Sequence, residues 1–312
     1  SLGRMREAWP LHRARQSPQR RQNNTRAPEV PWPQWQGEPL QGKSLLVWPE
    51  QGLGDGIQFA RYARLLKQRG VARLSFACQA ALAPLLRTID GIDDVVVKKS
   101  EVKPHDYWVF LMDLPERFDT TLDTIPAALP YVRALPERVA QWRPRLPNAP
   151  RVGLVWKGSS GHRNDAHRSL PGLATLTPLW QVAGVQFVSL EKGAGEDEAA
   201  HPPAGQPLTA LGAQFQDFAD AAAVVSQLDL VICVDTAVAH LAGALGRPVW
   251  VLLPALDPDW RWLKEREDSP WYPGVMGLFR QQSIGGWDET MVRVADALQA
   301  FVRPQPPSRP PE

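Results

Sequence analysis

Residues suited to chemistry gather in three segments, and each of these directly follows an apolar run typical of a buried strand. The first is the glycine-rich turn at 51–56 (QGLGDG), after the apolar run 44–48. Its glycines would let the backbone approach a ligand closely, and the N-terminus of the helix predicted at 57–69 would favour an anion. The same helix dipole favours an ionised Asp55, which could accept a proton from an attacking hydroxyl. Asp55 could also simply cap the helix. The turn candidates are Gln51, Gly52 and Gly54.

A dinucleotide-binding turn is the first alternative for this segment, and two features argue against it. The glycines at 52, 54 and 56 do not give the full G-x-G-x-x-G spacing. The second strand also ends in Cys78 and Gln79, without the acid that would hold a ribose. The sequence therefore disfavours an NAD site.

The second segment is the polar loop at 157–169, after the strand predicted at 151–156. It holds three cations together with hydroxyl and amide groups, which suits a diphosphate, although polar loops are common. Its two histidines have no cysteine or carboxylate at zinc-like spacing, so we predict no metal there. The candidate ligands in this loop are Lys157, Asn164, Arg168 and Ser169.

The third segment follows the apolar strand predicted at 228–234. Asp235 or Thr236 can cap the next helix, and Thr236 with the first free N–H groups, beginning near Ala237, can hold a phosphate. His240 lies about one turn further along the same face. Its apolar neighbours are equally consistent with a satisfied core histidine, so both roles stay open.

Two series of alternating strands and helices must position these segments. The first begins near residue 41, and the second follows the proline-rich stretch 143–150. Such alternation predicts an α/β fold of two doubly wound, Rossmann-like domains with parallel sheets, facing across a cleft. The predicted divisions are a basic, proline-rich tail and linker at 1–40, a first domain at 41–145, a second at 151–285, a closing helix at 286–303 and a disordered tail at 304–312.

Composition excludes some classes of partner. The net charge of +2 over 312 residues predicts no particular anionic partner. Residues 1–22 are rich in arginine and could touch nucleic acid, but we expect a solvated, poorly ordered arm and no nucleic-acid partner. The two cysteines, Cys78 and Cys233, lie in apolar runs and are interpreted as buried thiols in a reducing compartment. No signal-peptide pattern or transmembrane segment is evident, so we expect a cytoplasmic protein.

Four phrases in order give the sequence a family resemblance. They are QGLGDGIQFARY at 51–62, VDTAVAHLAGALGRP at 234–248, DWRW at 259–262 and DSPWY at 268–272. Together they resemble the heptosyltransferase-type glycosyltransferases, family 9-like, over roughly residues 30–302. The likeness is closest to the subset found after tetratricopeptide repeats in bacterial proteins, and residues 1–15 look like the end of a last repeat helix. The start at Ser1 suggests a processed or excerpted chain.

The resemblance implies a GT-B fold, with the acceptor on the first domain and a nucleotide-sugar donor on the second. It implies an inverting, metal-independent transfer without a cofactor, in which Asp55 matches the general base. The residues that match the donor-binding segment are Asp235, Thr236, Ala237 and His240.

One position departs from the family pattern. Heptosyltransferases carry Lys-x-Trp-Pro in the first loop of the donor domain, where this chain has the sequence RSLP at 168–171. Arg168 would then balance the leaving diphosphate, so the resemblance does not fix heptose as the sugar. Glu191 and Lys192, at the end of the next strand, are expected to touch the nucleoside. The acceptor is a glycan or a protein.

Three rival functions stay open. The string Asp257-Pro258-Asp259 fits the DxD motif of metal-dependent transferases. A degenerate transferase could hold a nucleotide or a protein without turnover, although the retention of Asp55 argues against it. A structural adaptor would use the tryptophan-rich surface and bind no nucleotide sugar.

Overall fold

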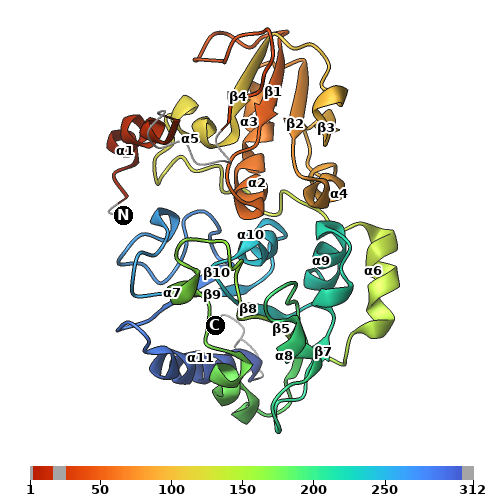
Figure 1. Ribbon diagram of the computed structural model, residues 1–312, viewed down its shortest axis with the longest axis vertical. Helices are drawn as coiled ribbons and strands as arrows, with labels where there is room; N and C mark the ends of the chain where they lie inside the picture. Colours follow the sequence, from red (N-terminus) through yellow and green to blue (C-terminus); the bar gives the residue numbers. More distant parts are fainter. Residues whose placement is uncertain (1–2, 17–25, 304–312) are drawn as a thin grey trace, which may run out of the picture.

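The computed structural model describes residues 3–16 and 26–303, and its first sheet has four parallel strands. They follow the order β3-β2-β1-β4 (Figure 1). The strands are β1 (Ser44–Trp48), β2 (Arg73–Ala77), β3 (Asp94–Val96) and β4 (Tyr107–Phe110). The central strand β1 is apolar on both faces, as expected for a parallel strand covered on both sides.

The second sheet has six parallel strands in the order β10-β9-β8-β5-β6-β7. They are β5 (Arg151–Val155), β6 (Gln186–Ser189), β7 (Thr209–Ala210), β8 (Leu230–Val234), β9 (Val249–Leu253) and β10 (Met276–Arg280). In each sheet the order reverses beside the first strand, between β1 and β4 in one and between β5 and β8 in the other. These are the switch points where doubly wound folds bind ligands. The predicted fold class is confirmed.

Helices and short turns connect these strands. The α-helices after the N-terminal one are α2 (Leu53–Phe59), α3 (Ala63–Gln68), α4 (Ala83–Leu86), α5 (Leu114–Arg117), α6 (Pro136–Trp142), α7 (Asp165–Arg168), α8 (Glu196–Ala200), α9 (Phe218–Val225), α10 (Ala237–Ala244) and α11 (Trp287–Val302). The helix predicted at 57–69 begins four residues earlier and is interrupted by a 3₁₀ turn at 60–62. Asp55 therefore lies within the first turn of α2.

The helix α6 packs on α9, although it precedes the second sheet in the chain (Figure 1). The indole N–H of Trp142 donates to the carboxylate of Asp220 at 2.9 Å, and Arg138 pairs with the same carboxylate at 2.8 Å. Residues before the proline-rich stretch thus contribute to the packing of the second sheet.

The basic N-terminal arm is ordered and docked where the structure describes it, so the expectation of a poorly ordered arm is wrong for residues 3–16, although Arg4, Arg6 and Arg13 stay exposed. The helix α1 (Met5–His12) packs beside α5 (Figure 1). The side chain of Trp9 is buried. The Trp9 indole donates to the carbonyl of Thr120, and its ring meets Trp260 edge-on at 5.7 Å. Local charge had suggested solvation, but apolar residues four apart, Met5 and Trp9, anchor the helix. Arg20, Arg21 and the tail 304–312 lie outside the described residues.

Two further predictions can be checked here. Both cysteines are free and buried, as expected. Among residues 3–16 and 26–303, no helix has the length and apolar character needed to cross a membrane.

Candidate active site

The glycine turn joins β1 to α2 at the carboxyl edge of the first sheet. Gln51 takes φ +57°, and Gly52 then occupies the N-cap position of α2. The Gly52 N–H donates to Oδ2 of Asp55 at 2.8 Å. Asp55 is therefore not the N-cap residue itself, but it caps one free N–H of the helix from the third helical position.

The other carboxylate oxygen of Asp55 reaches the second domain. Oδ1 pairs with the guanidinium of Arg261, which follows β9. Burial raises the pKa of the Asp55 carboxyl, while the Arg261 charge and the Gly52 N–H oppose that rise. The Asp55 side chain keeps 13% of its surface exposed, so it remains within reach of a small group.

Gly54 brings the turn against α10 of the second domain. A Cβ at Gly54 would lie 2.8 Å from Cδ2 of His240, so a larger residue would push the two helices apart. Figure 1 shows α2 directly facing α10. The His240 ring stacks on Trp262 at 5.4 Å, and its Nδ1 lies 2.9 Å from the Tyr272 hydroxyl. Burial, with the nearby charges of Arg261 and Arg61, lowers the pKa of His240, which is therefore neutral.

The switch point of the second sheet gathers the third segment. Asp235 follows β8, and its carboxylate accepts from the Trp262 indole N–H at 2.9 Å. Burial raises the pKa of Asp235 to about 6. Within the described part of the chain, the buried Thr236 hydroxyl has no hydrogen-bond partner. Ala237 begins α10 directly behind it.

Arg168 links the polar loop after β5 to this segment. Its Nη1 donates to the carbonyl of Asp235 at 2.9 Å, and its Nε lies 3.3 Å from Asp165. Ser169 stabilises the same turn, because its hydroxyl donates to Asp165 and accepts from the Gly158 N–H, both at 2.8 Å. The structure thus brings Arg168 beside the end of β8, while Ser169 stabilises the turn that follows β5.

Three other predicted donor ligands make structural contacts. The Lys157 amine donates to the Pro171 carbonyl at 2.7 Å. The Asn164 amide donates to the carbonyls of Leu256 and Asp257, both at 3.1 Å. The Lys192 amine donates to the Ala213 carbonyl at 3.2 Å, which directs it to the loop after β7.

Glu191, next to Lys192, orients the start of the polar loop. Its Oε1 accepts from the backbone N–H groups of Trp156 at 2.5 Å and Lys157 at 2.6 Å. Burial raises the pKa of Glu191 to about 7, although these two N–H groups favour its charged form. A Cβ at Gly212 would lie 1.9 Å from the Glu191 carbonyl oxygen, so only glycine fits there.

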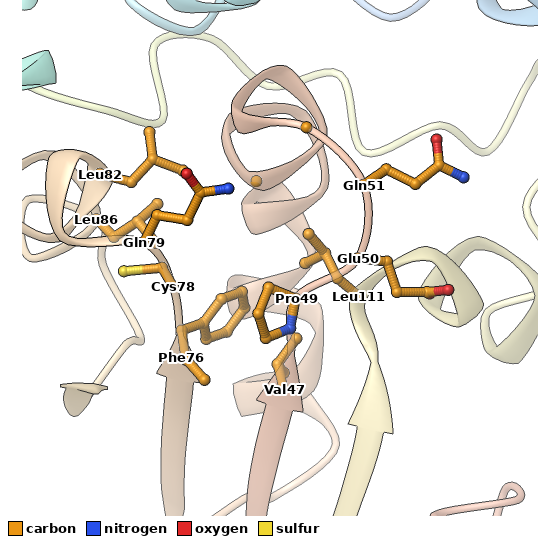
Figure 2. A pocket seen from close by; sticks show the side chains of 13 residues that line it. Val47, Pro49, Glu50, Gln51, Phe76, Cys78, Gln79, Leu82, Leu86 and Leu111 are labelled. Carbon is orange, nitrogen blue, oxygen red and sulfur yellow. The ribbon is translucent and has the colours of Figure 1, made fainter. Parts of the chain in front are cut away.

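A small cavity of about 20 Å³ lies between the glycine turn and the end of β2. Figure 2 shows its apolar walls, and it shows the Gln79 amide pointing toward the turn. Among the described residues that line the cavity, only Glu50 is charged; its side chain points away and pairs with Arg15 at 2.9 Å. The cavity has room for about one water molecule.

Sequence reasoning missed two arginines near these groups. Arg15 pairs with Glu50 and also with Asp113, at 2.5 Å, beyond the end of β4. Arg261 pairs with Asp55 and, at 2.7 Å, with Asp259. Arg261 lies inside the DWRW phrase, so a signal for it was present in the sequence.

A metal site would need several histidine, cysteine or carboxylate side chains close together. Within residues 3–16 and 26–303 no three His, Cys, Asp or Glu side chains form a group that could hold an ion. Both acids of the DxD string meet arginines, because Asp257 pairs with Arg163 at 3.0 Å and Asp259 pairs with Arg261.

The fold is that of the GT-B glycosyltransferases, and part of the chain matches a glycosyltransferase family. Residues 175–259, which include Asp235 and His240, match the sequence model of Glycosyltransferase family 9 (heptosyltransferase). The chain is 32% identical to Protein FlbA of Caulobacter vibrioides over 335 aligned positions, which cover 96% of this chain. It spans only 53% of the length of that relative.

Solved structures share the fold at low identity. A family 9 glycosyl transferase from Veillonella parvula superposes with a TM-score of 0.62 and 12% identity, covering 85% of this chain and 99% of its own. The ADP-heptose lps heptosyltransferase II of E. coli gives 0.60 and 14%, covering 83% and 98%. The iron-containing, dodecameric glycosyltransferase TibC from enterotoxigenic E. coli gives 0.50 and 15%, covering 80% and 66%.

Proposed function

We propose that this chain is a metal-independent, inverting glycosyltransferase that moves a sugar from a nucleotide-sugar donor to a hydroxyl of a glycan or protein acceptor. The observation that carries the proposal is the meeting of two switch-point segments across the domain interface. Asp55 of the first domain contacts Arg261 of the second, and Gly54 approaches His240. A general base and a donor site must face each other in this way for a direct displacement.

The donor would bind at the switch point of the second domain. Thr236 supplies a buried hydroxyl without a partner among the described residues, and α10 begins just behind it. Free N–H groups and the dipole of a helix N-terminus stabilise phosphate. Arg168, held against the Asp235 carbonyl, adds a fixed positive charge. We assign the nucleoside diphosphate to these groups.

Asp55 would act as the general base. Its carboxylate takes the proton of the acceptor hydroxyl while the acceptor oxygen bonds to the anomeric carbon. The bond from that carbon to the diphosphate breaks on the opposite face, and the diphosphate leaves with the electron pair. Because the attack is a single displacement, the anomeric configuration inverts. Arg168 stabilises the charge that develops on the leaving group.

The acceptor would approach along the first domain. Asp55 lies in the first turn of α2, at the carboxyl edge of the first sheet, where doubly wound domains bind ligands. The cavity beside the glycine turn holds only about one water molecule, so the acceptor would bind outside it.

A thermal-shift screen against UDP, GDP, ADP, CMP and dTDP, with EDTA present, tests the donor site. A ligand that binds only the folded chain raises the melting temperature by mass action. We expect one nucleotide to raise it clearly despite the chelator, and the matching sugar nucleotide to be turned over. If EDTA abolished nucleotide binding, the proposal that the transfer needs no metal would be wrong. A well-folded sample that responds to none of the five would favour a degenerate domain or an adaptor.

A further inference from the structure

Arg261 is a buried cation at the contact between the two domains. It lies in the 3₁₀ turn Trp260–Trp262 after β9, and its side chain is only 6% exposed. The guanidinium binds two carboxylates, with Nη2 on Asp55 and Nη1 on Asp259 at 2.7 Å. It is also held between aromatic faces, 5.2 Å from the Phe59 ring and 5.0 Å from the Trp260 ring.

We propose that Arg261 is the positioning residue for Asp55, fixing its carboxylate and keeping it charged from across the domain interface. This inference rests on the proposed role of Asp55 as the general base. Because Arg261 belongs to the second domain, it can hold the carboxylate of Asp55 in place only when the two domains are in contact. The planar fork of arginine suits this role, because it binds two carboxylates in a fixed geometry.

The ion pair leaves Asp55 able to act. A carboxylate has about four acceptor positions, and the hydrogen bonds from Arg261 and from the Gly52 N–H at 2.8 Å occupy two of them. The side chain also keeps 13% of its surface exposed. An acceptor hydroxyl can therefore donate to a free lone pair while both existing contacts hold the carboxylate in place.

The surroundings explain why a cation is needed. Asp259 lies on the same turn as Arg261 and repels the charge of Asp55. Asp235, after β8, is a further acid whose charge acts on Arg261, and His162 of the polar loop has its pKa lowered by burial.

Two histidines face the cluster from helices: burial lowers the pKa of His240 on α10, and it lowers the pKa of His12 on α1 to about 3. Both rings are neutral and supply no positive charge. Arg261 is therefore the cation in direct contact with Asp55.

The experiment measures the titration of Asp55 directly by carbon NMR on protein labelled at aspartate carboxyl carbons. Asp55→Asn assigns the signal by its loss. In Arg261→Met the Asp55 carboxyl should titrate at higher pH than in the wild type, because a buried carboxylate without its cation holds its proton more tightly. In Arg261→Lys, which keeps the charge, the midpoint should stay closer to the wild-type value.

Two arginines serve as matched controls. Arg266 lies in the same loop and pairs with Asp268 at 2.7 Å, so Arg266→Met removes an Arg–Asp pair that does not involve Asp55. Arg61 also crosses the interface, donating to the Trp271 carbonyl at 2.5 Å. Neither Arg266→Met nor Arg61→Met should move the Asp55 titration. An unchanged Asp55 midpoint in Arg261→Met, or an equal shift in the controls, overturns the proposal.

Activity provides the second measurement, with the nucleotide sugar identified by the screen. Arg261→Met should lower kcat/KM at pH 7 by about 10-fold or more, with partial recovery as the pH rises and Asp55 ionises. Full activity in Asp55→Asn would overturn the base and with it the proposed mechanism. An inactive Asp55→Asn alongside a wild-type pH profile in Arg261→Met would overturn only the role of Arg261. If Arg261→Met does not fold, Arg261→Gln, which keeps a hydrogen-bond donor without the charge, replaces it in both measurements with the same expected shifts.

Discussion

The two switch points have the same topology but different contents. In the first domain, Glu50 after β1 and Asp113 beyond β4 are both buried, and Arg15 from the N-terminal segment lies between their carboxylates. In the second domain, Arg168 reaches the end of β8 through the carbonyl of Asp235 and pairs with the partly exposed Asp165 at 3.3 Å, and within the described chain the Thr236 hydroxyl has no partner. One crevice is filled by the chain itself, whereas the other keeps polar groups that a ligand could satisfy. Strand order alone therefore does not make a binding site.

A second contrast concerns two buried glutamates. Glu50 meets the guanidinium of Arg15, while Glu191 in the second domain meets two backbone N–H groups. Burial raises the pKa of Glu191 to about 7, so its charge depends on small changes around the polar loop. The first domain stabilises its acid with a cation, and the second does so with loop backbone beside the proposed donor site. The Glu50–Arg15 ion pair of the first domain is therefore suited to a structural role.

The largest expected effect is on turnover and concerns Asp55, the proposed general base in the first domain. Asp55→Asn keeps the shape and can still accept from the Gly52 N–H, but it cannot take a proton. We expect turnover to fall by about 10²–10⁴, with donor binding retained. Steady-state rates and the dissociation constant of the nucleotide check this. Near-wild-type turnover would remove Asp55 from the mechanism.

The next effect is on stability and tests whether Arg15 is structural. Arg15→Met leaves Glu50 and Asp113 buried without their cation, which should lower the free energy of unfolding by about 3–5 kcal/mol. Denaturant unfolding measures this. Arg13→Met is the control, because Arg13 pairs with Glu116 but is 55% exposed, so its loss should cost about 1 kcal/mol or less. Equal costs for the two variants would mean that the first switch point is not held by Arg15.

Those parts of the molecule that are built from residues close together in the sequence could be predicted. A buried strand, a glycine turn and a helix are contiguous, so the surroundings of Asp55 and of Asp235 could be inferred locally. Contacts between distant segments left no such pattern. Arg261 meets Asp55 across 206 positions, and Arg15 meets Asp113 across 98. The N-terminal arm was expected to be solvated because its arginines are close together in the sequence. The carboxylates that pair with Arg15 are far away in the sequence, so no local pattern indicated the contact.

The third effect tests the open switch point. Arg168→Ala should weaken binding of the nucleoside diphosphate by roughly 10- to 100-fold, the range expected when a hydrogen bond to a charged group is lost. Isothermal titration measures the dissociation constant. Arg163→Ala is the control, because Arg163 lies in the same loop but is exposed and pairs only with Asp257 among the acids of the described chain. An unchanged constant in Arg168→Ala would place the diphosphate elsewhere.

The smallest expected effect separates a structural role of the Thr236 hydroxyl from a role in nucleotide binding. Thr236→Val keeps the β-branched shape and removes a buried hydroxyl that has no partner within the described residues. The unliganded chain should be as stable as the wild type, or more stable by about 1 kcal/mol, since an unsatisfied buried polar group is lost. Nucleotide affinity should fall by about 2- to 10-fold, because the diphosphate loses one hydrogen bond.

Ser269 supplies the matched control for this variant. Its hydroxyl is also buried and has no partner in the described chain, but it lies outside both switch points. Ser269→Ala should leave stability unchanged or raised, with nucleotide affinity unaltered. Opposite movements of stability and affinity in Thr236→Val alone would show that this hydroxyl is left unpaired for a ligand. If both variants keep full affinity, the unpaired hydroxyl of Thr236 is a packing feature, and the contrast between the switch points then rests on Arg168.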